Sequence, residues 1–290
     1  MLAPEDLPSA LDPSHLPLIE RLLTEHPRTP SEYQLANLYL FRAAHRYTVH
    51  NAPLPCVTGT TYDGVRHALP LGPLDAAALP AIAAIAACIY PLAEGEARQL
   101  AAASALALSY NSDDSDYLYD AVRLSTLAGA KTKAQQARAF EAAASPRLAP
   151  LEAIGPEAAY GILDLWLRQS GRAPKATDSA ACREAIACAP ELGLQGMAVI
   201  AEGRPSGFLL AGPARNGVRV VHFAKGRRDQ AGLYPWMFAR FAAVCGAKIL
   251  NFEQDLGSPG LAQAKRALAP ASVLHKYRLQ LRLTTVEDRP

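Results

Sequence analysis

The sequence predicts an α+β fold with two domains, in which mixed β-sheets are covered by helices. Its 290 residues suggest two domains of ordinary size. Long alanine-rich stretches predict that much of the chain is helical. The second half shows three strand-like runs, followed by a helix, a strand, a helix and a last strand. A β-meander that leads into a β-α-β unit indicates a mixed sheet with helices packed on it.

The first half combines helical segments with a β-rich region. Residues 47–72 contain short β-rich runs separated by proline and glycine turns. Residues 76–93 form an 18-residue stretch without charge, near the lower limit for a membrane span. Because this stretch is mostly alanine and is bracketed by prolines, we expect a buried helix of about ten residues and no transmembrane segment. The other predicted helices cover residues 13–25, 31–43, 94–105, 119–128 and 131–144.

A proline-rich segment separates the two halves. Residues 145–156 contain three prolines and are the predicted linker, so we expect domains at 1–148 and 149–290. Glycine and proline turns divide the apolar runs that follow into separate strands. The predicted elements of the second half are helices 159–172 and 177–192, strands 197–203, 207–213 and 218–224, helix 233–246, strand 248–253, helix 260–268 and strand 275–283.

Charge and cysteine content restrict the classes of partner and compartment. Residues 213–290 hold 13 Lys and Arg against 5 Asp and Glu, a net charge of +8, whereas the rest holds 16 against 22, a net charge of −6. The last quarter therefore has either an anionic partner (a phosphate-bearing cofactor, a nucleic acid or a lipid headgroup) or only a basic surface. The five cysteines show no metal-ligand spacing, and the acidic N-terminal segment is not a signal peptide. We therefore expect a cytoplasmic protein without a metal site.

Two carboxylates close a predicted strand. Glu253 and Asp255 are two residues apart at the end of strand 248–253, so they can point the same way. A turn and a helix start follow directly, as in many α/β active sites. One hypothesis makes these acids catalytic, with one of them accepting a proton or binding an amine. The alternative is that they cap the next helix and pair with Lys265 or Lys276. His222, alone in strand 218–224, is interpreted as structural.

Five segments carry a resemblance to a known family. They occur in the order SEYQLANLYLFR, SDYLYDAVRLSTLAGAKTKAQQARAF, LGLQGMAVIAEGRPSGFLLAG, VVHFAKGRRDQAGLYPWMFARFA and NFEQDLGSPGLAQAKRALAPASVLHKYRL. Together they resemble the domain found at the C-terminal end of phosphatidylglycerol lysyltransferases, over roughly residues 31–282. The last segment is the most specific, with its E-Q-D-L-G, its downstream lysine and its K-Y-R.

The resemblance implies a fold and an activity. It implies two acetyltransferase-like (GNAT-like) domains in tandem, each with a mixed, mainly antiparallel sheet flanked by helices. Larger relatives transfer an aminoacyl group from a charged tRNA to a lipid hydroxyl. The expected function is therefore that of a soluble acyl- or aminoacyltransferase acting on an amine or hydroxyl. Its co-substrate would be aminoacyl-tRNA or acyl-CoA, with no tightly bound cofactor.

The resemblance also indicates where a donor would bind. GNAT domains hold the donor's pyrophosphate at the start of the helix that follows the third strand. Here that segment is KGRRDQAGLY, so the expected donor-binding residues are Lys225, Arg227, Arg228, Gly232, Lys265 and Lys276. The acetyl-CoA signature Q/R-x-x-G-x-G/A is matched only in part. These charges would therefore serve a tRNA acceptor end as well as a CoA thioester.

Two alternatives remain at this stage. The first is an acyl-CoA-dependent N-acyltransferase acting on a small amine. The second is a non-catalytic binding protein that keeps the GNAT fold and its basic groove. Binding of CoA species would distinguish the first, and loss of activity on removing the acids would argue against the second. The sequence identifies neither the acceptor, nor the transferred group, nor the oligomeric state.

Overall fold

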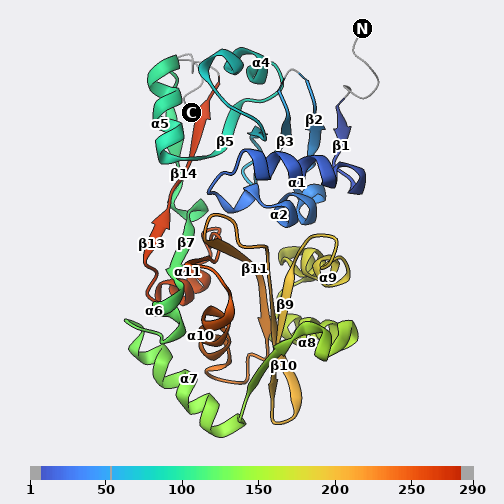
Figure 1. Ribbon diagram of the computed structural model, residues 1–290, viewed down its shortest axis with the longest axis vertical. Helices are drawn as coiled ribbons and strands as arrows, with labels where there is room; N and C mark the ends of the chain where they lie inside the picture. The colour runs from blue at the N-terminus through green and yellow to red at the C-terminus, as the bar shows by residue number, and fades with distance from the viewer. Residues whose placement is uncertain (1–7, 53, 282–290) are drawn as a thin grey trace. The chain divides into compact units, whose positions relative to one another are not determined.

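The chain folds as two units, one inserted into the other along the sequence. The computed structural model describes residues 8–52 and 54–281. Unit 1 contains the chain up to Ser115 and again from Leu274 onward, whereas unit 2 contains Asp116–Val273. Each unit is built on its own seven-stranded sheet (Figure 1). The chain thus leaves unit 1, completes unit 2, and returns to unit 1.

The sheet of unit 2 has the strand order β13-β7-β12-β11-β10-β9-β8. Strands β8 to β11 pair antiparallel, β11 and β12 pair parallel, and β12 pairs antiparallel with β7. The parallel pair is the β-α-β unit expected from the sequence, with α10 as its crossover. The strands are β7 (Asp116–Asp120), β8 (Arg147–Pro150), β9 (Gln195–Ala201), β10 (Arg204–Ala211), β11 (Val218–Gly226), β12 (Ile249–Asn251) and β13 (Ser272–Leu274).

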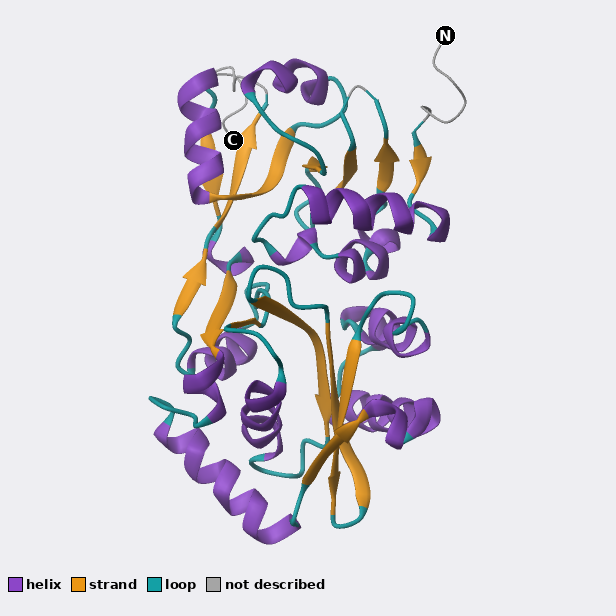
Figure 2. Ribbon diagram, in the orientation of Figure 1, coloured by secondary structure: helices purple, strands orange, loops and turns teal. Residues whose placement is uncertain are grey.

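Helices cover both faces of the unit 2 sheet. Helices α8 and α9 lie on one side of β9, β10 and β11, and α10 lies on the other (Figure 2). The core on the α10 side contains Phe140, Trp236, Phe241 and Leu250, all buried, and α7 packs against α10 there. The helices are α6 (Ala121–Ser125), α7 (Lys131–Ala144), α8 (Gly155–Ser170), α9 (Ser179–Ala187), α10 (Leu233–Val244) and α11 (Pro259–Arg266).

The sheet of unit 1 has the order β1-β2-β3-β4-β5-β14-β6. Strand β14 lies between β5 and β6 and pairs antiparallel with both, while β4 and β5 are parallel. The strands are β1 (Ser9–Ala10), β2 (Thr48–His50), β3 (Cys56–Thr60), β4 (Arg66–Pro70), β5 (Cys88–Ala93), β6 (Leu108–Tyr110) and β14 (Lys276–Gln280). The helices are α1 (Leu16–Glu25), α2 (Leu35–Leu40), α3 (Arg42–His45), α4 (Leu79–Ala83) and α5 (Glu94–Ser104).

The core of unit 1 includes the returning strand. Helix α5 packs along β5 and β14 (Figure 1). Ile89, Leu92 and Leu279 are fully buried on that face, together with Leu79 and Ile82 of the α4 segment. Both units therefore have mixed, mainly antiparallel sheets flanked by helices, which confirms the predicted α+β fold class.

The structure differs from the expected elements in three places. Residues 76–93 contain only the short α4, and the buried strand β5 follows, in keeping with the strand preference of Ile89 and Tyr90. Residues 116–120 form β7 before α6 begins, where the helix 119–128 was expected. The strand expected at 275–283 forms as β14 but in the sheet of unit 1, and its last two residues lie outside the described part of the chain.

The observed division also differs from the expected domains 1–148 and 149–290. The chain passes between units at 115/116 and 273/274. The proline-rich segment that suggested a linker contains β8, which pairs with β9 through residues 147–150. Because β8 is an edge strand of its sheet, it tolerates a proline that cannot donate a ladder hydrogen bond.

Among the helices described, none is both long and apolar enough to cross a lipid bilayer.

Candidate functional site

A β-bulge in unit 2 directs His222 out of the regular strand pairing. Leu210 of β10 pairs with Phe223 of β11, and the next residue, Ala211, pairs with Val221, so the register skips His222. Such a bulge leaves one residue of the longer strand unpaired and redirects its side chain. His222 is buried all the same, with its side chain only 1% exposed.

The neighbouring strand diverges from β11 at the same level. Strand β11 pairs with β12 only from Val218 to Val220, although β11 itself continues to Gly226. The chain of β12 ends its pairing at Asn251 and turns away. His222 and Glu253 each lie two residues beyond the last paired residues, so the divergence leaves space between the strands for both side chains.

His222 and Glu253 meet across this divergence. The Nδ1 atom of His222 lies 2.9 Å from Oε1 of Glu253. Because a carboxylate oxygen can only accept, the geometry assigns the proton to Nδ1. The Nε2 atom of His222 is buried and has no hydrogen-bond partner among the described residues. The Glu253 side chain is 16% exposed, so the pair joins a buried imidazole to a carboxylate that reaches solvent.

The turn after β12 holds Glu253 in an unusual backbone conformation. Glu253 has φ +56°, in the left-handed region that a residue with a Cβ rarely adopts. Its N–H donates to Oδ1 of Asn251 at 2.7 Å, and its carbonyl accepts from the N–H of Tyr117 at 3.2 Å. Asn251 is itself fully buried and donates to Oδ2 of Asp116 at 2.9 Å. Several hydrogen bonds therefore determine where the Glu253 side chain begins.

Asp255 faces inward and is occupied by contacts within the turn. Its Oδ2 accepts the hydroxyl of Tyr117 at 2.6 Å, and its Oδ1 accepts the N–H of Gly257 at 3.0 Å. The residue is only 3% exposed. Burial, and then the carboxylate of Asp255, raises the pKa of Tyr117, which keeps the phenol protonated as a donor. The two acids predicted to act together thus have different environments.

Lys265 also belongs to this turn. Its Nζ atom lies 2.5 Å from the carbonyl oxygen of Phe252, 3.0 Å from that of Glu253 and 2.7 Å from that of Gln254. The residue is 9% exposed and projects from α11. The ammonium of Lys265 therefore contacts the backbone of the turn that carries Glu253.

Lys225, expected to bind a donor, is buried in an internal ion pair. Its Nζ lies 2.7 Å from both carboxylate oxygens of Asp178, and 4.0 Å from the centroid of the Trp166 ring. The Lys225 ammonium is therefore neutralised inside unit 2, where it links β11 to α8 and to the start of α9.

Arg227 and Arg228 lie in the turn that follows β11. Arg227 forms an exposed ion pair with Asp229 at 2.8 Å, and the backbone N–H of Arg228 donates to Gln169 at 2.7 Å. Both residues lie next to the N-terminus of α10, where a donor was expected. Exposed ion pairs of this kind are weak, so they can exchange for contacts with an anion.

The N-terminus of α10 offers few amide groups to a phosphate. Gly232, at φ +89°, precedes the helix, and a Cβ built there would overlap the carbonyl oxygen of Gln136 in α7. The N–H of Leu233 already donates to the carbonyl of Gln230 at 3.3 Å, and Pro235 has no N–H. Helix α7 thus lies close to the end of α10 where GNAT domains hold a pyrophosphate.

A family model decides which proteins this chain is related to. The model described as "Phosphatidylglycerol lysyltransferase, C-terminal" matches residues 24–280. The chain belongs to this family. No curated protein matches the chain.

Solved structures share the fold of this chain. A conserved protein of unknown function from Bacteroides thetaiotaomicron shares 20% identity, with a TM-score of 0.83 over 95% of this chain and 99% of that one. The C-terminal domain of a protein described as a lysylphosphatidylglycerol synthetase, from Agrobacterium fabrum, shares 12% identity, with a TM-score of 0.67 over 93% and 92%. L-PGS from Bacillus licheniformis shares 14% identity, with a TM-score of 0.62 over 95% and 94%. At these identities the similarity establishes the fold.

The family's terminal K-Y-R motif lies in unit 1. Lys276 is fully buried in β14, and its Nζ lies 2.7 Å from Oε1 of Glu32. Arg278 lies 2.5 Å from Asp63 and 3.5 Å from Asp114. Lys276, expected among the donor-binding residues, is therefore held in an ion pair of the other unit.

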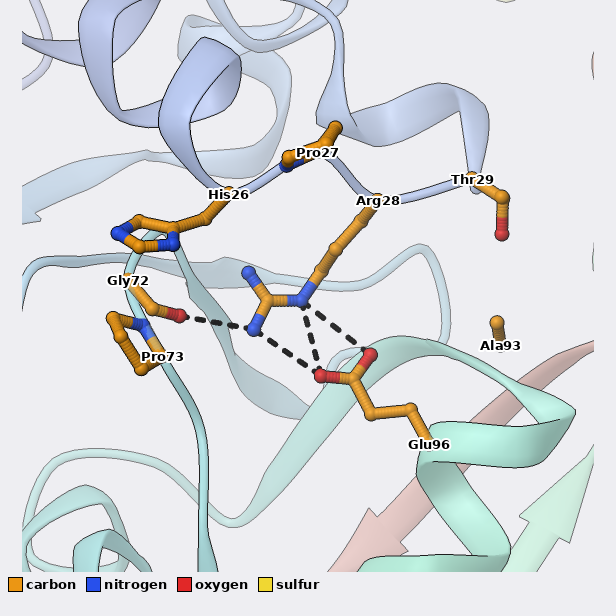
Figure 3. Close-up of a pocket in the computed structure, with 8 residues that line it drawn as sticks. All are labelled: His26, Pro27, Arg28, Thr29, Gly72, Pro73, Ala93 and Glu96. Carbon is orange, nitrogen blue, oxygen red and sulfur yellow. Dashed lines mark hydrogen bonds and ion pairs between the residues drawn. The ribbon is translucent and has the colours of Figure 1, made fainter. Parts of the chain in front are cut away.

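Unit 1 also contains a shallow pocket, which includes none of the predicted site residues. The Arg28 guanidinium projects into it, and donates to Glu96 at 3.2 Å and to the carbonyl of Gly72 at 3.0 Å (Figure 3). It also donates to the carbonyl of Pro70 at 2.7 Å. Through these contacts Arg28 joins the segment after α1 to the end of β4 and to α5 within unit 1. The pocket is lined by His26, Pro27, Arg28, Thr29, Gly72, Pro73, Ala93 and Glu96.

The structure brings three of the predicted site residues together and places two further side chains beside them. Glu253, Asp255 and Lys265 share one turn. His222 was predicted to be structural, and the only signal for it in the sequence is a histidine directly before the F-A-K-G segment. Tyr117 adds a hydroxyl that donates to Asp255. Within residues 8–52 and 54–281 no cluster of His, Cys, Asp and Glu side chains could hold a metal ion.

Proposed function

We propose that this chain is an acyl- or aminoacyltransferase whose reaction takes place in unit 2, beside Glu253. The observation that carries the proposal is the His222–Glu253 hydrogen bond at the divergence of the parallel strands β11 and β12. Such a divergence lets a substrate approach the backbone of a sheet. Membership of a family named for an aminoacyl transfer to a lipid supports the same reaction class.

In this proposal Glu253 is the general base. The amine or hydroxyl of the acceptor attacks the carbonyl carbon of the donor's ester, and a new C–N or C–O bond forms. The acceptor's proton passes to Glu253 and then to the departing ribose oxygen as the ester C–O bond breaks. His222 holds the carboxylate through Nδ1, and the partly exposed side chain of Glu253 is reached by the acceptor from solvent. Asp255, with both oxygens engaged, maintains the turn.

Aminoacyl-tRNA is the favoured donor because the α10 terminus is poorly suited to CoA. A pyrophosphate needs several free amide N–H groups at a helix start. The close approach of α7 at Gly232, the bonded N–H of Leu233 and the proline at 235 leave few there. Arg227 and Arg228, beside that helix, would contact the phosphates of a tRNA acceptor end. Lys225 and Gly232 would support this surface from within unit 2, because each is in internal contact, whereas Lys276 is held in an ion pair of unit 1 and has no part in it.

The activity test measures donor consumption. The purified protein is incubated with aminoacyl-tRNAs labelled in the amino acid, and loss of label from tRNA is followed with and without a small-molecule and lipid extract. A parallel series contains acyl-CoA thioesters, with release of free CoA as the readout. We expect consumption of aminoacyl-tRNA that falls about 10²-fold in Glu253→Gln, the usual size of a general-base effect. Glu191→Gln, an exposed carboxylate of unit 2, is the matched control.

The outcomes separate the candidate functions. Consumption of acyl-CoA alone would replace aminoacyl-tRNA with a CoA thioester as the donor. Binding of either donor without consumption, unchanged in Glu253→Gln, would favour a non-catalytic binding protein.

The donor surface has its own test. Charge reversal of Arg227 and Arg228 together should weaken tRNA binding and reduce the slope of log K against log salt by about 1.4, since each phosphate contact contributes about 0.7. Reversal of Arg21 and Arg98, both exposed on helices of unit 1, is the matched control. Equal binding and equal slope in the two double variants would exclude the turn after β11 as the donor surface.

A further inference from the structure

We infer that Lys265 is a positioning residue, whose ammonium holds the turn that presents Glu253 to His222. The inference rests on the proposed role of Glu253 and adds a residue that acts through it. Lys265 was expected to bind the donor's phosphate, or to neutralise the acids. Its contacts indicate a different task, because its ammonium lies against three backbone carbonyl oxygens and an aromatic ring.

The ammonium of Lys265 uses its full hydrogen-bonding capacity on three consecutive residues. A lysine ammonium has three N–H donors. The carbonyl oxygens of Phe252, Glu253 and Gln254 lie 2.5, 3.0 and 2.7 Å from Nζ. The ring of Tyr117 lies 5.5 Å away and adds a favourable face for the cation. A residue with these contacts, 9% exposed, has no N–H left to direct at a phosphate.

Three successive carbonyls converge on one point only because the backbone bends sharply between them. In an extended strand successive carbonyls point in alternating directions. The left-handed conformation of Glu253, at φ +56°, turns them to the same side. Three carbonyl dipoles directed at one buried point repel each other unless a cation lies between them. The Lys265 ammonium therefore stabilises the conformation that an ordinary residue at 253 resists.

The same conformation sets the direction of the catalytic side chain. The bond from Cα to Cβ of Glu253 follows its backbone angles, so relaxation of the turn would move the carboxylate away from Nδ1 of His222. Asn251 fixes the N–H of Glu253 from one side, and Lys265 fixes its carbonyl from the other. Helix α11 is thereby the support from which the position of Glu253 is set.

The test uses the imidazole of His222 as a reporter, with no donor present. An Nδ1–H bonded to a carboxylate and buried from water gives a slowly exchanging, downfield proton resonance, which is assigned by its absence in His222→Gln. We expect the signal to be lost in Lys265→Met, which keeps the aliphatic chain and removes the ammonium. It should persist in Lys265→Arg, which keeps the cation, and in Lys248→Met, an exposed lysine in the residue before β12. Persistence of the signal in folded Lys265→Met would overturn the inference.

A second neutral variant is needed in case Lys265→Met does not fold. Lys265→Gln is neutral but retains an amide donor, and its His222 signal should be weakened or absent in folded protein. If both neutral variants are unfolded while Lys265→Arg folds, Lys265 is a general stability residue and the inference fails.

Steady-state kinetics then test whether Lys265 affects the proposed reaction through the position of Glu253. With aminoacyl-tRNA as donor, Lys265→Met should lower kcat at nearly unchanged KM, and adding Glu253→Gln should cause little further loss, because both changes disable the same group. Independent, multiplying losses would contradict action through Glu253. Because the resonance is measured without substrate, failure of the proposed function leaves that part of the result readable.

Discussion

Two carboxylates two residues apart carry different tasks at the turn after β12. Glu253 reaches solvent and meets a histidine, whereas Asp255 is buried and accepts hydrogen bonds from Tyr117 and Gly257. A carboxylate that accepts two bonds inside the protein contributes to stability through both of them. The different roles of Glu253 and Asp255 therefore follow from their burial and their hydrogen-bond partners.

We expect Asp255→Asn to destabilise unit 2 by about 2 kcal/mol, because hydrogen bonds to a charged acceptor are replaced by weaker ones. Glu253→Gln should change the free energy of unfolding by less than about 0.5 kcal/mol, because its side chain is partly exposed. Chemical denaturation of both variants measures the difference. Equal destabilisation by the two substitutions would mean that Glu253 has a structural role of similar weight.

A histidine of unit 1 makes its stability depend on pH. His67 is 3% exposed, and its Nδ1 atom has no hydrogen-bond partner in the described structure. Burial, and then the charge of His45, lowers the pKa of His67 from 6.5 to about 3. Between these values the unfolded chain binds a proton that the folded chain does not, so stability falls as the pH falls.

The expected loss from His67 is about 2 kcal/mol between pH 7 and pH 5. Replacing His67 by Phe, which keeps an aromatic ring against Tyr47 and Tyr90, should remove this part of the pH dependence. Urea denaturation at several pH values, with His26→Phe as the control at a partly exposed histidine, measures the effect. An identical pH dependence in His67→Phe and wild type would show that His67 titrates similarly in both states.

At the scale of elements, the contact between α7 and α10 depends on one glycine. Gly232 has φ +89°, and a Cβ there would overlap the backbone of Gln136. We expect Gly232→Ala to destabilise the protein by about 2–4 kcal/mol, from backbone strain and overpacking together. Gly203→Ala is the matched control, because Gly203 has φ +72° with nothing within 4 Å of the built Cβ. It should cost about 1 kcal/mol. Equal melting temperatures for the two variants would argue against close packing of α7 on α10.

Most elements could be predicted because their signals are local. The run 131–144 contains strong helix formers, and α7 spans those residues. The meander and the β-α-β unit were readable from alternation and glycine turns, and they form β9 to β12. Strand β5 was missed because a short apolar run does not separate a buried strand from a buried helix.

The candidate site could be predicted only in part, for a related reason. Glu253 and Asp255 follow a visible strand, so their place at its end was predictable. The His222–Glu253 pair depends on a bulge and on the divergence of two strands, and neither leaves a sequence pattern. The internal ion pair of Lys225 with Asp178 joins residues 47 positions apart and was equally inaccessible. The catalytic and donor-binding assignments remain predictions for the experiments above.

At the scale of the whole molecule, the strand β14 links residues distant in sequence. Lys276 binds Glu32 across a separation of 244 residues, and Leu279 is fully buried in the core of unit 1. The sequence suggested one strand after another in a single second domain, because no local signal reports which sheet a strand joins. The family resemblance identified the tandem arrangement but not this exchange.

We expect Leu279→Ala to destabilise unit 1 by about 2–5 kcal/mol, the usual cost of removing a buried leucine side chain. Amide hydrogen exchange should then accelerate in β3, β4 and β5 and remain near wild type in β9 to β11. Leu250→Ala, at a fully buried leucine of β12, should give the opposite distribution. Faster amide exchange in unit 2 after the Leu279 substitution would contradict the assignment of β14 to the sheet of unit 1.

The return of β14 also has a consequence for synthesis on the ribosome. Strands β1 to β6 of unit 1 have been made by residue 110, but their sheet waits for residues 276–280 to fill the gap between β5 and β6. The segment translated first therefore waits for nearly the whole chain to be made before its sheet is complete. While it waits, unit 1 leaves the facing edges of β5 and β6 unpaired, a state open to wrong pairing and to chaperones.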